Sequence, residues 1–225
     1  MAFYDKTCIY LIAKKQKAVE AFFIVFYLVG ITGMLVPYTF PLFLKLIPLA
    51  LLLSFIALAL FHEGEVTRKI IIGFLAIFLL SFLIEAIGVN TGLVFGYYSY
   101  GGSLGLKLFQ TPIIIGVNWL FLIYTTASLV DNYKIPSLAK IILASTGMVL
   151  YDIVLEQVAP KLNMWHWKND IVPIQNYVAW FVLAFAFHSL LKVFKIKTNN
   201  KLSMLILVCQ FLFFLILSIS FKLMK

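Results

Sequence analysis

Seven continuous apolar segments, each 16 to 20 residues long, restrict the fold of this 225-residue chain more than any other feature of the sequence. About 20 apolar residues in a helix cross the hydrocarbon core of a bilayer, and a helix satisfies its own backbone hydrogen bonds there. A membrane barrel would instead alternate apolar and polar residues. The sequence therefore predicts an all-α fold, a polytopic integral membrane helical bundle of about seven transmembrane helices in a single transmembrane domain over residues 1–225. The predicted spans are residues 21–36, 42–61, 70–89, 113–130, 138–155, 174–193 and 202–221.

Basic residues are distributed unequally between the two sides of this predicted bundle. Twelve Lys and Arg residues lie on the side of the N-terminus and six on the other side. The positive-inside rule then predicts a multi-pass protein of the cytoplasmic membrane, with a cytoplasmic N-terminus and an external C-terminus. The net charge of +9 is explained by basic residues that face anionic headgroups. We therefore expect the lipid bilayer as a partner, and no nucleic acid.

Three of the nine acidic residues, Glu85, Asp152 and Glu156, lie within or at the end of apolar spans. Ionisable residues at such depth are costly and are candidates for function. Asp152 and Glu156 are four residues apart, which places both carboxyls on one helix face. Two neighbouring carboxyls in a low dielectric do not easily both ionise, so at least one is expected to hold a proton near neutral pH. For Glu156 alone, a position among the headgroups at the helix end is the alternative.

The predicted topology brings polar and aromatic residues to one membrane level. The third and fifth spans end on the external side, and the fourth and sixth spans begin there. Two long connections, residues 90–112 and 156–173, are expected to close over this level, as functional loops often do. The residues expected at this level are Glu85, Asp152, Glu156, Asn118, Trp119, Asn176 and Trp180.

Two interpretations apply to Trp165 and Trp167, which flank His166 in the second long connection. Tryptophan at a membrane surface commonly forms an interfacial belt. Alternatively, the indole faces line a pocket and stabilise a cationic intermediate. The sequence leaves both interpretations open.

Other chemistries find little support in the sequence. His62, Glu63 and Glu65 have no spacing that matches a known metal site, and a solvated turn is the favoured interpretation. The last span has no lysine near its middle, because Lys222 lies at its outer end, and this weighs against a retinal Schiff base. No nucleotide-binding loop, serine-hydrolase elbow or paired CxxC motif occurs.

Several short motifs follow one another between Glu85 and Phe187. They are Glu85-Ala-Ile-Gly88, Thr91 to Tyr100 (TGLVFGYYSY), Leu104-Gly105, Pro112, Asn118-Trp119, Asp152, Glu156, Trp165-His166-Trp167 and Pro173 to Trp180. In their order and spacing, they resemble the membrane-bound carotenoid biosynthesis proteins, a family that includes bacterioruberin-precursor and γ-carotene hydratases. The resemblance implies the addition of water across the terminal double bond of an acyclic carotenoid end group.

Such a hydration needs a proton donor, a stabilised tertiary carbocation and a positioned water. We expect Asp152 to be the acid, and Glu85 or Glu156 to be the carboxylate that accepts the proton of the attacking water. The expected substrate is an acyclic or monocyclic carotenoid, and the reaction requires no redox cofactor and no metal. The residues expected to bind the substrate are Tyr98, Tyr100, Asn118, Trp119, Trp165, Trp167, Asn176 and Trp180.

Two alternatives to a hydratase remain at this stage. A carotenoid cyclase begins with a similar protonation, but an internal double bond captures the cation. A non-enzymatic transporter of lipophiles or protons would use the acids as a relay. The acids cluster at one level and the two halves of the chain show no inverted repeat, which weighs against a transporter.

Overall fold

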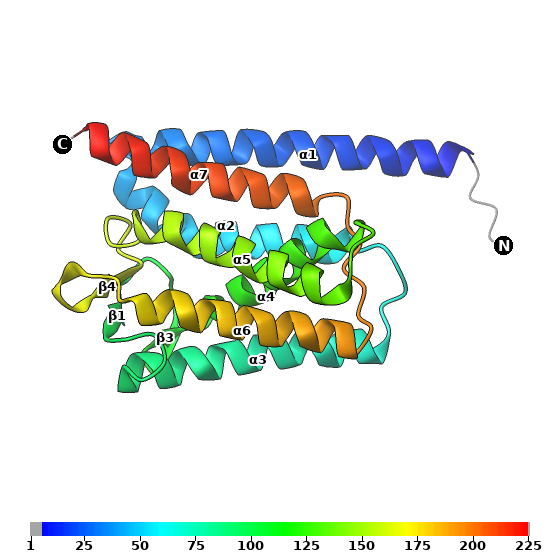
Figure 1. Cartoon of the computed structure of the whole chain (residues 1–225). Coiled ribbons are helices and arrows are strands. Elements are labelled where there is room, and N and C mark those ends of the chain that lie inside the picture. Colours follow the sequence, from blue (N-terminus) through cyan, green and yellow to red (C-terminus); the bar gives the residue numbers. More distant parts are fainter. Residues whose placement is uncertain (1–5, 225) are drawn as a thin grey trace.

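The structure, a computed structural model, describes residues 6–224 and, within the first helix, side chains from Lys15 onward. Seven helices lie side by side along one common direction, and short loops and strands connect their ends (Figure 1). The helices are α1 (Lys6–Leu35), α2 (Phe40–Leu60), α3 (Arg68–Thr91), α4 (Ile114–Asp131), α5 (Ser137–Glu156), α6 (Ile174–Val193) and α7 (Ser203–Leu223).

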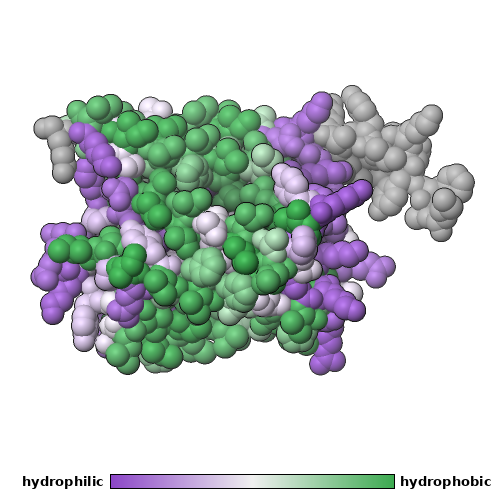
Figure 2. Space-filling view, viewed as in Figure 1, coloured by the Kyte–Doolittle hydropathy of each residue, from purple (hydrophilic) through white to green (hydrophobic). Residues whose placement is uncertain are grey.

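Each of these helices, in α1 the part from Lys15 onward, is long and apolar enough to span a membrane, which confirms the predicted fold class. Six of them match the predicted spans to within two residues at each end. α1 differs, because it begins at Lys6, well before the predicted start of the first span at residue 21. The face of the molecule seen in Figure 2 carries a broad hydrophobic band between two hydrophilic ends, as expected for a chain that crosses a bilayer.

α4 is the central helix of the bundle. In its most apolar stretch 72% of the residues are buried, against 22% to 39% in the other helices. It contacts α2, α3, α5, α6 and α7. A helix that is apolar on all sides is expected in such a position. Its hydroxyl groups do not oppose burial, because Thr125 and Thr126 donate to carbonyls one turn earlier, at 2.8 and 2.6 Å.

Local sequence signals set the helix ends near the two long connections. Gly92 ends α3 in the left-handed conformation (φ 70°), which glycine adopts without a steric penalty. Pro173 lies directly before α6, where its missing N–H leaves no hydrogen bond unmade. α3 ends and α6 begins at the same end of the bundle (Figure 1).

The two long connections pair with each other through β1 (Tyr98–Tyr100) and β4 (Trp165–Trp167), which are antiparallel. Beside them are a second pair, β2 (Lys107–Leu108) with β3 (Thr111–Pro112), and a 3₁₀ turn η1 (Lys168–Asp170). Gly101 continues the β1–β4 contact, since its N–H donates to the Met164 carbonyl at 2.8 Å. A Cβ atom at this position would lie 2.2 Å from the Asn163 carbonyl oxygen, so the close approach requires glycine.

At the opposite end of the bundle, polar contacts join the α2–α3 and α6–α7 connections. His62 Nδ1 lies 2.7 Å from the Tyr124 hydroxyl, and Glu63 pairs with Lys201 at 3.2 Å. Glu63 and Glu65 are exposed, in agreement with the predicted solvated turn. His62 is half-buried, because its ring packs edge-on against Tyr124.

Candidate active site

Four helices bring acidic, amide and indole side chains to the end of the bundle that β1 and β4 cover (Figure 1). α3 and α5 contribute side chains of their last two turns, and α4 and α6 those of their first two turns. The acids are Glu85 on α3 and Asp152 and Glu156 on α5, and the others are Asn118 and Trp119 on α4 and Asn176 and Trp180 on α6.

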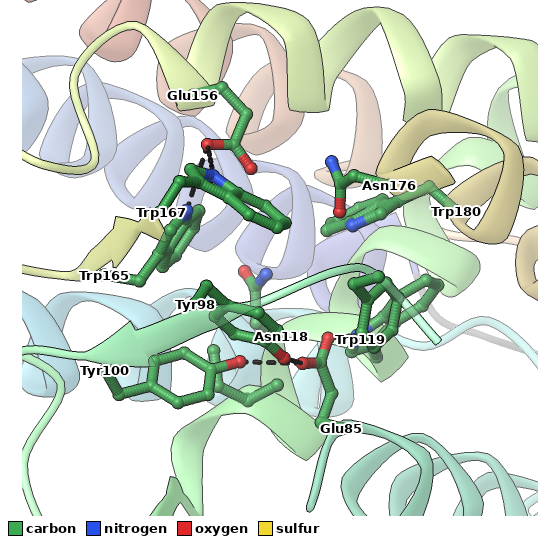
Figure 3. Close-up of a pocket in the computed structure, with 12 residues that line it drawn as sticks. Glu85, Tyr98, Tyr100, Asn118, Trp119, Glu156, Trp165, Trp167, Asn176 and Trp180 are labelled. Atoms are coloured by element: carbon green, nitrogen blue, oxygen red, sulfur yellow. Dashed lines mark hydrogen bonds between the residues drawn. The ribbon is translucent and has the colours of Figure 1, made fainter. Parts of the chain in front are cut away.

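A small buried cavity of about 30 Å³ lies among these side chains. A cavity of roughly 10 to 15 Å³ already holds one water molecule, so this one has room for water. Ten of the eleven predicted site residues line it, and the exception is Asp152. The lining residues are Glu85, Phe95, Tyr98, Tyr100, Ile115, Asn118, Trp119, Glu156, Trp165, Trp167, Asn176 and Trp180 (Figure 3).

The pairing of β1 with β4 explains how four aromatic rings reach the cavity. Side chains of a strand point alternately to its two faces. In this register Tyr98 lies opposite Trp167 and Tyr100 opposite Trp165, with ring centroids 5.0 and 6.2 Å apart. His166, between the two tryptophans, is exposed. The two strands therefore form an aromatic wall, and His166 faces away from it.

Glu85 is 5% exposed and accepts three hydrogen bonds. Its Oε2 atom accepts from the hydroxyls of Tyr98 and Tyr100, at 2.7 and 2.8 Å. Its Oε1 atom accepts from the indole N–H of Trp119 at 2.9 Å. Both oxygens are thus occupied by donors, which is the arrangement that suits a carboxylate.

The two tyrosines remain donors over a wide pH range. Burial, and secondly the neighbouring carboxyl of Glu85, raises the pKa of the Tyr98 and Tyr100 hydroxyls well above its ordinary value. Both hydroxyls therefore keep their protons at physiological pH and above. The two hydrogen bonds by which these tyrosines hold Glu85 therefore do not change with pH in this range.

Glu156 makes an asymmetric set of contacts. Its Oε2 atom accepts from the indole N–H groups of Trp165 and Trp167, at 3.0 and 2.7 Å. Within the described part of the chain, no residue hydrogen-bonds to its Oε1 atom. Both tryptophans are buried, 7% and 6% exposed. Of the two interpretations of Trp165 and Trp167, these contacts favour a pocket wall and not an interfacial belt.

Asp152 lies behind the cavity, one helical turn before Glu156. It is fully buried, and its Oδ2 atom accepts from the side-chain N–H of Asn176 at 2.8 Å. Its Oδ1 atom has no hydrogen-bond partner among the described residues. Asp152 therefore does not line the cavity itself, but it is hydrogen-bonded to Asn176, which does.

A second aromatic surface lies beside Glu85. The rings of Trp119 and Trp180 stack with centroids 4.5 Å apart and planes 29° apart, and Phe187 packs edge-on against Trp119 at 6.0 Å. Indole faces attract cations through their quadrupole. The cavity therefore has aromatic walls on two sides and carboxyl groups on two others.

Two lining residues, Phe95 and Ile115, are absent from the sequence predictions. Phe95 is 1% exposed and packs edge-on against Tyr98, with centroids 6.1 Å apart. Phe95 lies within the Thr91 to Tyr100 motif, which could have indicated it, whereas nothing distinguishes Ile115 among the many isoleucines of the chain. Among the residues described, no three His, Cys, Asp or Glu side chains form a set that could hold a metal ion.

Comparison with known proteins places the site within a matched region. The model of a family described as carotenoid biosynthesis protein matches residues 46–225, which include every residue that lines the cavity. The chain is also similar to bisanhydrobacterioruberin hydratase of Haloarcula japonica, with 27% identity over 128 residues. The similar region covers 51% of this chain but only 42% of that protein's length. No solved structure matches the chain.

Proposed function

The chain belongs to the carotenoid biosynthesis protein family, and from this premise we propose that it adds water to the terminal double bond of an acyclic carotenoid end group. The observation that carries the proposal is the placement of Glu156 and Glu85 on opposite sides of one aromatic cavity (Figure 3). The similarity to a protein named as a hydratase supports the reaction type. A carotenoid end group, which is purely hydrocarbon, suits a site lined mainly by aromatic rings.

Glu156 is the proposed acid. In a protonated carboxyl group the carbonyl oxygen accepts hydrogen bonds and the hydroxyl oxygen donates one. Oε2, which accepts from two indoles, fits the carbonyl oxygen, and Oε1, free of hydrogen bonds among the described residues, fits the hydroxyl. Proton transfer from Oε1 to the less substituted, inner carbon of the alkene would form a C–H bond from the π electron pair, while the electron pair of the broken O–H bond stays on Oε1. The positive charge then lies on the more substituted carbon.

The aromatic walls stabilise this tertiary cation. Trp is the strongest of the cation-binding rings, and its contribution grows in a desolvated site. The stacked pair Trp119–Trp180 and the ring of Trp167 all line the cavity. Because the site is buried, stray nucleophiles do not reach the cation.

Glu85 is the proposed base. A water molecule attacks the cation through an oxygen lone pair, and its surplus proton passes to the carboxylate of Glu85. The proton that Glu156 gives to carbon is thus balanced by the one that Glu85 accepts, and exchange with water restores both groups. The three donors that hold Glu85 fix its position for this step.

For Asp152 we propose a role other than that of the acid, which the sequence favoured. Since it does not line the cavity, we propose that it positions Asn176, and that its carboxyl, one turn from that of Glu156, makes ionisation of both acids unfavourable. Asn176 in turn faces the cavity and can orient the attacking water.

The cavity of about 30 Å³ has room for water but not for a hydrocarbon end group. Binding of the end group must therefore displace some of the lining side chains.

Expression in a lycopene-producing bacterium, followed by chromatography and mass spectrometry of the pigments, tests the proposed function. A hydratase adds the mass of one water for each converted end, whereas a cyclase leaves the mass unchanged. Conversion by purified protein in the absence of any gradient separates an enzyme from a transporter. A pigment profile identical to that of the empty host would overturn the proposal.

We predict that Trp167→Phe retains more activity than Trp167→Leu. Both variants lose the 2.7 Å hydrogen bond to Glu156, but phenylalanine keeps an aromatic face near the cation. A cation–π interaction of about 1 kcal/mol corresponds to a difference of roughly fivefold in rate. The measurement is hydrated product per unit of membrane-inserted protein. Equal specific activity of the two variants would remove Trp167 from the cation-stabilising wall.

The proposed orientation places the site in the external half of the cytoplasmic membrane, because twelve of the 18 Lys and Arg residues lie on the side of the N-terminus. We predict that a periplasmic reporter enzyme is active when fused after Lys225 and inactive when inserted after Glu65. A cytoplasmic reporter should give the reverse pattern. Activity of the periplasmic reporter only at Glu65 would move the site to the cytoplasmic half.

A further inference from the structure

The side chain of Asn118, in the second turn of α4, is buried but makes no hydrogen bond to the described part of the protein. It is 8% exposed and lines the cavity of the candidate active site. Figure 3 shows its amide group directed into this cavity. Burying an amide without a partner is costly. The amide therefore contributes nothing to the fold through hydrogen bonds, and it faces whatever occupies the cavity.

Asn176, the other amide of the cavity wall, differs from Asn118 in this respect. Its N–H donates to Asp152 at 2.8 Å, so only its Oδ1 atom is left for a molecule in the cavity. The hydroxyls of the two tyrosines in the aromatic wall are likewise used as donors, to Glu85. Asn118 therefore offers a molecule in the cavity both a donor and an acceptor, whereas Asn176 offers an acceptor.

The size of the cavity indicates that this molecule is water. The cavity measures about 30 Å³, and one water needs roughly 10 to 15 Å³, so about two waters fit. A buried water needs about two to four polar partners. Asn118, the Oδ1 atom of Asn176 and the Oε1 atom of Glu156 supply them. A hydrocarbon end group, in contrast, has no donor or acceptor to offer an amide.

The proposed hydration requires a particular orientation of such a water. The water attacks the cation through a lone pair on its oxygen, so acceptors have to hold its hydrogens. The Oδ1 atom of Asn118 can accept from one of them. The carboxylate of Glu85 can accept from the other, because its Oε1 atom receives a hydrogen bond only from Trp119 and has a lone pair left. Both groups line the same small cavity.

We propose that Asn118 holds the attacking water and thereby decides that the carotenoid cation becomes an alcohol, a role that rests on the proposed function. The water lone pair forms the C–O bond, and the surplus proton passes to Glu85. When the water is not held, the cation instead loses a proton from a neighbouring carbon to a carboxylate, and the electron pair of that C–H bond restores a double bond. Asn118 thus acts after the protonation step.

A reaction in D₂O, with purified full-length protein and lycopene, separates these two outcomes. Glu156 then delivers a deuteron to carbon. Deuterium is retained in the alcohol and, where the cation reverts to an alkene, in part of the unhydrated carotenoid. Chromatography and mass spectrometry measure both, and the readout is the ratio of alcohol to deuterated, unhydrated carotenoid. A general distortion of the site lowers both quantities together and leaves this ratio unchanged.

Asn118→Leu is expected to lower this ratio by about tenfold or more, because one hydrogen bond to a reacting group is worth roughly that factor. Leucine has a similar size, and the substitution removes no hydrogen bond within the described structure. Asn118→Val should have the same effect. Asn118→Thr has the shape of the valine variant but keeps a hydroxyl group, so its ratio should lie nearer to that of the wild type.

Asn132→Leu is the matched control, since it removes an exposed amide at the other end of α4. We expect it to leave both the rate and the ratio unchanged. A wild-type ratio in Asn118→Leu would overturn the role of Asn118. If that variant does not insert into the membrane, the valine and threonine variants decide, and equal ratios in these two would overturn it.

Failure of this inference and failure of the proposed function give different results. A wild-type protein that forms alcohol, together with Asn118 variants of unchanged ratio, overturns the role of Asn118 alone. A wild-type protein that forms no alcohol overturns the proposed function, and the role of Asn118 with it.

Discussion

Glu156→Gln is expected to lower carotenoid hydration by at least about 100-fold, the usual consequence of removing a general acid. The structure also indicates that this substitution leaves the fold intact. The glutamine carbonyl can accept the hydrogen bonds that Oε2 now accepts from Trp165 and Trp167. Its NH₂ group would replace Oε1, to which no described residue is hydrogen-bonded, so no existing contact is lost. The measurement is hydrated product per unit of membrane-inserted protein.

Two further variants make this result specific. Glu65→Gln, at an exposed position at the other end of the bundle, should retain full activity. Asp152→Asn should retain more activity than Glu156→Gln, because its amide oxygen can still accept the hydrogen bond of Asn176. If Asp152→Asn were inactive and Glu156→Gln kept more than about a tenth of wild-type activity, Asp152 would be the acid instead.

Glu85→Gln is expected to cause a comparable loss, about 100-fold or more, since it removes the proposed base and its negative charge. Here we also expect a lower stability. Three donors now point at Glu85, from Tyr98, Tyr100 and Trp119. A glutamine can accept from Trp119 only by turning its NH₂ group toward the two tyrosine hydroxyls, which must then become acceptors. Replacing charge-assisted by neutral hydrogen bonds should cost about 1 kcal/mol.

Two measurements check this prediction. They are the hydrated product per unit of membrane-inserted protein and the midpoint of thermal unfolding in detergent. Glu85→Asp is the matched control, because it keeps the charge and shortens the side chain. We expect it to be more active than Glu85→Gln. An active, equally stable Glu85→Gln protein would show that the carboxylate at this position is not the base.

The sequence predicted the helical framework because hydrocarbon thickness acts on each segment independently. A run of about 20 apolar residues is a span whatever its neighbours do. This argument did not predict the early start of α1 at Lys6, because a helix can extend beyond the apolar run that hydropathy detects. The level at which Glu85, Glu156 and Asn176 meet was also predictable, because alternate spans run in opposite directions.

The identities of the site residues followed from the rarity of polar groups in apolar spans and from the family resemblance, and ten of these eleven residues line one cavity. The pairing of β1 with β4 did not follow from the sequence. Its strands are three residues long, and 64 positions separate Tyr100 from its partner Trp165. Short strands have too little period-two pattern to be recognised from sequence.

What the sequence determined by itself is thus the number of spans, their approximate ends and the common level of the acids, all properties of single segments. The tertiary structure decided that Asp152 stands behind Asn176 while Glu156 faces the cavity, and that Tyr98, Tyr100 and Trp119 all donate to Glu85. These contacts join residues between 13 and 34 positions apart in the chain. A side chain's direction relative to another segment depends on how the helices rotate and pack, and that is decided only when their side chains interlock.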